Sequence, residues 1–330
     1  VFTATSFAGS GANLTGISAG VTYKSEGTNF TGSLIIGHST TGTLNASQYN
    51  TAVGLTALDA ITSGDKNVAV GYNSLGLNTT GGKNVAIGRN AFAANTTAAY
   101  GTAVGTDALL SNTTGASNTA VGYFCLDANT TAGDNTGVGS HCLGANTTGT
   151  YNTGVGGSAL VANTTGGNNV AFGNNALAAN TTASYNTALG REALVSNTTG
   201  ANQTAVGRRA LQDTTTGGYN TAVGAEALGN NTTGTHNVAL GYISQLAATT
   251  GDYNVSAGNE SLRNLTTGDK NTAIGHDALY TNAVGSYLTA VGYEALYYQT
   301  GDNNTAFGYQ AAKASNGSAS ANVAVGHQAL

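Results

Sequence analysis

The stretch N-V-A-V-G-Y-N-S-L-G-L-N-T-T-G-G-K, residues 67–83, is followed at once by N-V-A-I-G-R-N-A-F-A-A-N-T-T-A-A-Y, residues 84–100. Both are versions of one seventeen-residue unit. Its first glycine recurs in steps of seventeen from Gly54 to Gly292, and then after sixteen and eighteen residues, at Gly308 and Gly326. A short fixed period predicts a repeat architecture in which neighbouring units stack on one another.

Positions in the unit are counted here from that glycine, which is position 0. The consensus is N-T-A-V-G-Y-x-A-L-x-x-N-T-T-G-x-x, with a sizeable hydrophobe at −1, a small residue at +3 and leucine at +4. We expect the side chains at −1 and +4 to fill the interior. In the first units these are Val53, Val70, Ile87 and Val104 at −1, and Leu58, Leu75, Leu109 and Leu126 at +4. So few hydrophobes per unit form an adequate core only when units stack.

The T-A-V segment alternates with a period of two, which predicts a short strand with positions −3 and −1 on its inward face. The glycine at 0 and the N-T-T-G segment are typical of tight corners. We therefore expect an all-β, parallel β-solenoid whose coils each contain two short strands and two corners. Residues 33–330 form this solenoid, with register slips near 293–330, and residues 1–32 form an N-terminal connector. At ~4.8 Å per coil, the rod is on the order of 90 Å long.

Asparagine recurs at −4, where in-register stacking predicts a structural ladder of side-chain amides. The ladder consists of Asn50, Asn67, Asn84, Asn118, Asn135, Asn152, Asn169, Asn186, Asn220, Asn237, Asn254 and Asn271. A second, partial ladder is expected in the N-T-T segment at +7. Both ladders satisfy backbone groups at the corners and fix the register.

The units K-N-V-A-V-G (66–71), N-N-V-A-F-G (168–173) and H-N-V-A-L-G (236–241) resemble the repeat of trimeric autotransporter adhesin heads. The longer unit is similar to repeats in bacteriophage and large-virus tail fibres, and residues 2–17 resemble the segment that precedes such repeats. The resemblance implies a left-handed coil and a homotrimer. It also implies a location in the virion, as part of a tail fibre, or elsewhere outside the cell. We expect the parent protein to continue beyond Leu330.

Composition excludes several other classes. Only 8% of the residues are charged, the net charge is −5, and there are no basic clusters. Nucleic acid is therefore not an expected partner. No apolar run approaches the ~18 residues of a membrane helix, so membrane insertion is not expected.

Residues for catalysis do not converge. The five histidines fall in different columns or many units apart, and the acidic residues lie mainly at +2, as on a solvated face. We therefore expect no enzyme, no cofactor and no metal. Cys125 and Cys142 are seventeen residues apart at +3, where a disulfide is geometrically conceivable. Free stacked thiols that replace alanine are the preferred interpretation.

Tyrosine at +1 is the surface feature with binding character, as at Tyr72, Tyr123, Tyr242 and Tyr293. These rings could contact a host receptor or glycan, cover a solenoid face, or line a trimer interface. The N-T-T triplets, Asn13, Asn29, Asn254 and Asn264 are formal glycosylation sequons. Their periodicity fits a corner better than a glycan site.

We expect a structural fibre shaft, foremost of a phage tail fibre involved in host attachment. Its partners are further copies of the chain and a host-surface receptor or glycan. The alternatives are a bacterial surface adhesin or extracellular filament, and an ice-binding solenoid. Against ice binding, Thr at −3 is expected to point inward.

Overall fold

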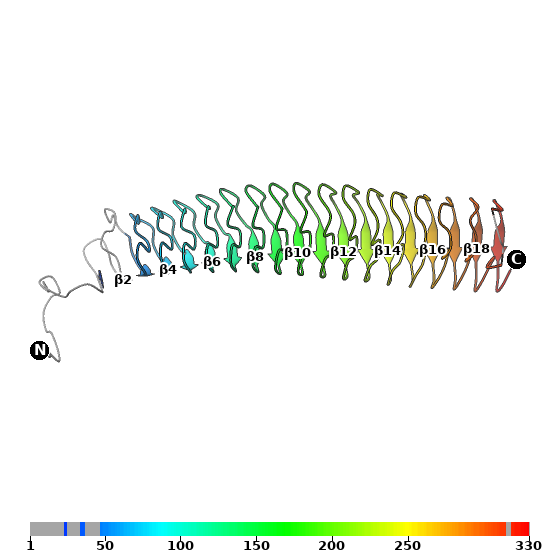
Figure 1. Cartoon of the computed structure of the whole chain (residues 1–330), viewed down its shortest axis with the longest axis horizontal. Coiled ribbons are helices and arrows are strands. Elements are labelled where there is room, and N and C mark those ends of the chain that lie inside the picture. Colours follow the sequence, from blue (N-terminus) through cyan, green and yellow to red (C-terminus); the bar gives the residue numbers. More distant parts are fainter. Residues whose placement is uncertain (1–22, 25–33, 37–46, 315–317, 330) are drawn as a thin grey trace, which may run out of the picture.

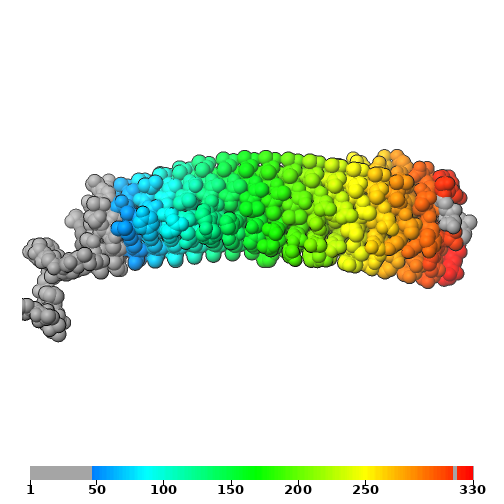
Figure 2. All heavy atoms as spheres, viewed as in Figure 1, coloured from blue at the N-terminus to red at the C-terminus, as the bar shows by residue number. Residues whose placement is uncertain are grey.

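The computed structural model describes residues 23–24, 34–36, 47–314 and 318–329, and this part of the chain forms one parallel β-solenoid without helices. One strand per coil stacks on the next, and the strands run in single file along a rod (Figure 1). The space-filling view shows a gently bowed rod of nearly constant thickness (Figure 2). The predicted fold class is confirmed, whereas the predicted connector lies outside the described residues except for Tyr23–Lys24.

From β3 onward each strand is the T-A-V segment of one unit. The strands are β1 (Tyr23–Lys24), β2 (Leu34–Ile36), β3 (Thr51–Val53), β4 (Val68–Val70), β5 (Val85–Ile87), β6 (Thr102–Val104), β7 (Thr119–Val121), β8 (Thr136–Val138), β9 (Thr153–Val155), β10 (Val170–Phe172), β11 (Thr187–Leu189), β12 (Thr204–Val206), β13 (Thr221–Val223), β14 (Val238–Leu240), β15 (Val255–Ala257), β16 (Thr272–Ile274), β17 (Thr289–Val291), β18 (Thr305–Phe307) and β19 (Val323–Val325).

The strands pair in parallel and in register from β2 to β19, while β1 pairs with β2 antiparallel. The short and long steps do not disturb this pairing. Thr289 of β17 pairs with Thr305, and Thr305 pairs with Val323, so a sixteen-residue turn is followed by an eighteen-residue turn. Equivalent positions of all units therefore form straight columns along the rod.

The strand is inverted relative to the expectation from sequence. The alanine at −2 points inward and is fully buried, as at Ala52 and Ala69, while −3 and −1 point outward. Val53 and Ile87 are 39% and 41% exposed, and Val70 and Val104 are partly exposed. Their assignment to the core was therefore wrong. Alternation defines two faces of a strand, but the space opposite the strand decides which face is inside, and here it admits only a small side chain.

Leucine at +4 supplies the bulk of the interior, as predicted. Leu58, Leu75, Leu109 and Leu126 have no exposed surface. Burying a leucine stabilises the fold by roughly 1.5–3 kcal/mol relative to leaving it in water. The apolar core runs along the axis as two clusters, and the break between them lies where Gln245 replaces leucine at +4 beside the buried Ser244 and Ser256.

The side of the coil opposite the strand is built from turns, so the expected second strand is absent from the described coils. Residues at +2, +4 and +12 take a left-handed φ, for example Asn73 at 56° and Leu75 at 50°. The N–H groups at +2 and +4 consequently point to opposite neighbouring coils. Asn73 N donates to Leu55 O of the preceding coil (3.0 Å), and Leu75 N donates to Ala91 O of the next (3.1 Å). The turns are thus bonded between coils much as the strands are.

The glycine at position 0 is required by its backbone. Gly207 has φ of +135°, and a Cβ there would lie 2.4 Å from Gly224 O of the next coil. A residue with a side chain would be strained at this φ and would also collide. The glycine column therefore sets how closely the coils approach at this corner.

Candidate binding surfaces

The asparagines at −4 serve the fold. All twelve predicted ladder residues are fully buried. The side-chain oxygen of Asn152 accepts a bond from Asn169 N (3.0 Å), and its amide donates to Gly166 O (2.8 Å). The ladder thus runs mainly from side chain to backbone. The +7 column adds direct amide-to-amide bonds: Asn163 donates to the side-chain oxygen of Asn146 in the preceding coil (2.9 Å) as well as to Gly166 O of its own coil (2.9 Å).

The +7 column contains the asparagines of the N-T-T sequons. Asn146, Asn163 and Asn180 are fully buried, and their amide nitrogens already donate to interior carbonyl oxygens. A glycan attached to this nitrogen would displace those bonds and would have no path to solvent. In the folded rod these positions are therefore structural. Asn254 is also fully buried, whereas Asn13 and Asn29 lie outside the described residues.

Cys125 and Cys142 are free thiols in adjacent coils, and both are fully buried. Each sulfur occupies room that an alanine methyl takes elsewhere. A Cβ at Gly137 would lie 2.6 Å from Cys125 Sγ, and one at Gly154 would lie 2.5 Å from Cys142 Sγ. The hydrogen bond with Cys142 and burial raise the pKa of Cys125, which keeps this sulfur protonated. The preferred interpretation, stacked thiols, agrees with this arrangement.

The outward positions −3 and −1 of the strands form a surface that we call the strand face. From β3 to β19 it carries only Thr, Val, Ile, Leu, Phe and Ala, without one charged residue. Its largest side chains stand well out of the rod, with Phe172 53% and Phe307 58% exposed. The −1 column is apolar in all seventeen coils, whereas threonine occupies −3 in eleven of them. A soluble monomer seldom exposes so long a row of apolar side chains.

The side chains at +1 and +2 form a second surface, the turn edge, which is mixed and internally paired. Glu192 accepts bonds from Arg209 Nε (2.8 Å) and from Arg191 (2.6 Å), and Arg209 followed by Arg191 lowers the pKa of this carboxyl. Towards β19 the rings of His276, Tyr293, Tyr309 and His327 stack with centroids 5.6, 5.3 and 5.0 Å apart. Many groups on this edge therefore already have a partner within the chain.

The predicted surface tyrosines lie on the turn edge and are exposed. Tyr72, Tyr123 and Tyr242 are 50–53% exposed and Tyr293 41%. The structure does not gather them into one site, because the first three are separated by several coils. Tyr123 instead packs edge-on against Phe124 and His141.

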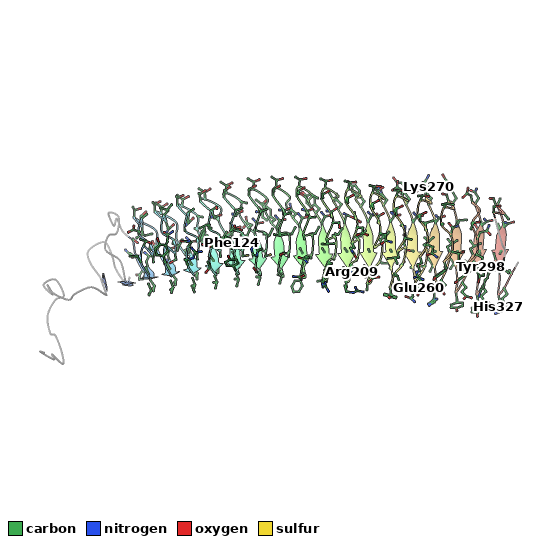
Figure 3. All side chains as sticks on the ribbon, viewed as in Figure 1. Phe124, Arg209, Glu260, Lys270, Tyr298 and His327 are labelled. Carbon is green, nitrogen blue, oxygen red and sulfur yellow. The ribbon has the colours of Figure 1, made fainter. Side chains whose placement is uncertain are left out.

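The side chains at +9 and +12 form a third surface, the corner edge. Lys270, at +12, lies along the upper edge of the rod in Figure 3, whereas Glu260 and His327 of the turn edge lie along the lower one. Threonine occupies +9 in twelve consecutive units from Thr80 to Thr267, and every copy is exposed. At +12, tyrosines alternate with polar residues over a long stretch that begins at Tyr151.

Deeper sites are scarce on this rod. One shallow hollow of about 440 Å³ lies between Leu77 and Leu110. Among the described residues no group of three or more His, Cys, Asp or Glu side chains is arranged to hold a metal ion. In the same part of the chain no helix is long and apolar enough to cross a membrane.

Neither a family model nor a curated protein matches the sequence.

Proposed function

We propose that the protein is a passive structural shaft, assembled from several copies of this chain that pack through the strand face. The observation that carries this proposal is the uncharged outer surface of β3 to β19. Seventeen coils at ~4.8 Å and two columns ~7 Å apart give a strip on the order of 550 Å² per chain. Burying exposed side chains such as Phe172 and Ile274 between chains removes apolar surface from water and stabilises the assembly.

The shaft is a homotrimer in the assembly that the resemblance implies, with the three strand faces around a common axis. The shaft is part of a phage tail fibre and holds a host-attachment region at a distance from the virion. Two features of the rod support this role. Its repeated interior gives length without catalytic groups, and its stacked hydrogen bonds in every coil give stiffness. Binding to a host-surface receptor or glycan belongs to the outer edges.

The oligomeric state tests the assembly. We expect light scattering of the purified chain to give a trimer. Leu189→Glu with Val223→Glu places two charges on the strand face and should give a monomer with an unchanged circular dichroism spectrum. The control, Asn174→Glu with Ala225→Glu at +1, should remain trimeric. A monodisperse wild-type monomer would contradict the proposal.

The location separates the tail fibre from a bacterial adhesin or extracellular filament, since all three would use the same rod. Antibodies against the chain should label tail structures of phage particles in electron micrographs. Labelling confined to cell surfaces or to free filaments would favour the alternatives.

An ice-binding solenoid is a second candidate, because threonine at −3 points outward and the objection from sequence is thus removed. Thr187, Thr204 and Thr221 stand in adjacent coils on the strand face. Phe172 and Phe307 interrupt the flatness of the face, which favours packing between chains. Thermal hysteresis in a solution of the purified chain would establish the ice-binding function, and its absence removes it.

A further inference from the structure

The +12 column changes character at Tyr151. From there to Tyr287 every second coil carries a tyrosine and the coil between carries a polar residue. The order is Tyr151, Asn168, Tyr185, Asn202, Tyr219, His236, Tyr253, Lys270 and Tyr287. The five tyrosines are 53–63% exposed, at least as much as the tyrosines predicted from sequence as surface binders. The alternation therefore produces a regular, accessible row of rings.

The geometry of this row is fixed by the backbone. All nine residues share a left-handed φ between 57° and 63°, so their side chains leave the coil in a common direction. With coils stacked at ~4.8 Å, successive tyrosines lie ~9.6 Å apart along the axis. The tyrosines of the row therefore repeat along the rod with a regular period of two coils.

The chemistry of the row combines apolar platforms with unused polar groups. In the described part of the chain, the hydroxyls of Tyr151 and Tyr185 and the side-chain amides of Asn168 and Asn202 make no hydrogen bond. The exposed threonines at +9 run parallel to them. Near His236 the ring faces are partly covered, because the imidazole of His236 stacks between the rings of Tyr219 and Tyr253, with ring centroids 4.9 and 4.8 Å apart. Tyr151 and Tyr185 are therefore the most open positions.

We propose that the corner edge binds an extended β-1,4-linked polysaccharide that lies along the rod, with one tyrosine against every second sugar. In such a chain alternate sugars are turned over, so the same sugar face returns after two rings, a distance close to two coils. Tyrosine rings contact the apolar faces of the sugars, and the amides between them bond to hydroxyls.

Two other linear polymers fit less well. A peptide in a β-strand presents equivalent side chains every ~6.7 Å, which falls out of step with a ~9.6 Å row after one repeat. A nucleic acid strand requires a positively charged groove, whereas Lys270 is the only cation among the nine residues of the row. An uncharged polymer with a two-ring period matches the spacing of the tyrosines and does not require a positively charged groove.

Calorimetric titration with cellohexaose and chitohexaose tests this proposal, with α-1,4-linked maltohexaose as the linkage control. We expect the wild-type protein to bind one of the β-linked hexaoses and not the α-linked one. Tyr151→Ala with Tyr185→Ala should weaken binding at least tenfold, and Asn174→Ala on the turn edge should leave it unchanged.

A sharper variant is Tyr185→Asn combined with Asn202→Tyr, which preserves composition and breaks the two-coil period. It should bind as weakly as the double alanine variant. Binding equal to wild type in this variant, equal binding of maltohexaose, or no binding of either β-linked hexaose would overturn the proposal. The inference extends the proposed attachment role but does not depend on the assembly: a monomeric chain that binds the hexaose contradicts the trimer and leaves the glycan site standing.

Discussion

The strand face and the turn edge lie on the same rod, yet their columns vary differently from coil to coil. At −1, on the strand face, sixteen of the seventeen coils from β3 to β19 carry Val, Ile, Leu or Phe. At +1, on the turn edge, the residues range from Tyr72 and Arg89 to Gly157 and Asn174. In its uniformity of residue type from coil to coil, the exposed strand face resembles the buried leucine column at +4 more than it resembles the exposed turn edge.

Uniformity inside the rod has a known cause, since each buried side chain must fit against identical copies above and below. The strand face is as uniform without being buried in the single chain. A partner chain that packs along its whole length would impose the same restriction. On the turn edge, where water is the main neighbour, the residue type is free. The following substitutions compare fixed columns with free ones.

The largest expected effect is at position 0. Gly207→Ala introduces a Cβ 2.4 Å from Gly224 O at a φ of +135° and should lower the free energy of unfolding by roughly 3–5 kcal/mol. Gly157 stands at +1 in another coil, and an alanine Cβ there meets only the flexible side chain of Asn174. Gly157→Ala should therefore change the free energy of unfolding by less than about 0.5 kcal/mol. Urea unfolding of both variants measures the difference. Equal stabilities would mean that the coils can separate at this corner.

An intermediate effect is expected in the asparagine ladder. Asn152→Ala leaves Asn169 N buried without a partner, whereas Gly166 O keeps its bond from Asn163, so the change should cost roughly 1–3 kcal/mol. Asn174→Ala removes an exposed bond to Gly157 O and should be nearly neutral. Thermal unfolding distinguishes the two. A neutral Asn152→Ala would show that water replaces the ladder.

The smallest effect concerns Asp277, a partly buried carboxyl on the turn edge. Burial, opposed by His276, raises the pKa of Asp277, and the carboxyl oxygen Oδ1 has no hydrogen-bond partner among the described residues. Its native form holds the proton more tightly than the unfolded chain, so stability should fall as pH rises from about 3.9 to the folded pKa. Asp277→Asn should remove this slope.

Glu192 supplies the control of opposite sign. Arg209 and then Arg191 lower the pKa of its carboxyl, so its contribution is present above the unfolded pKa and is lost as pH falls through the folded value. Glu192→Gln should therefore flatten a slope that runs the other way. Unfolding curves between pH 3 and 7 compare the two variants, and slopes of the same sign would contradict the assignment.

The seventeen-residue period was sufficient to predict the solenoid, because repeated units with so little apolar material must stack. The leucines and the asparagine columns were also placed correctly. Val53 and Ile87 were not, because T-A-V alternation is symmetric with respect to inside and outside. Leu75 illustrates a second limit. A leucine with left-handed φ is unfavourable by itself, so only the bonds between coils, which are long-range, reveal the turn side. The corner-edge row was visible as recurring tyrosine, but its accessibility required coordinates.

The glycines opposite the two sulfurs have a genetic consequence. Because coils are in register, a gene segment that encodes whole units can be duplicated or lost and the rod simply becomes longer or shorter. This freedom stops where one coil is fitted to the next, as Cys125 is to Gly137 and Cys142 to Gly154. A crossover between β7 and β9 would pair a cysteine with alanine, or a glycine with alanine, and leave a clash or a hole. Rod length is therefore free to evolve everywhere except at such matched boundaries.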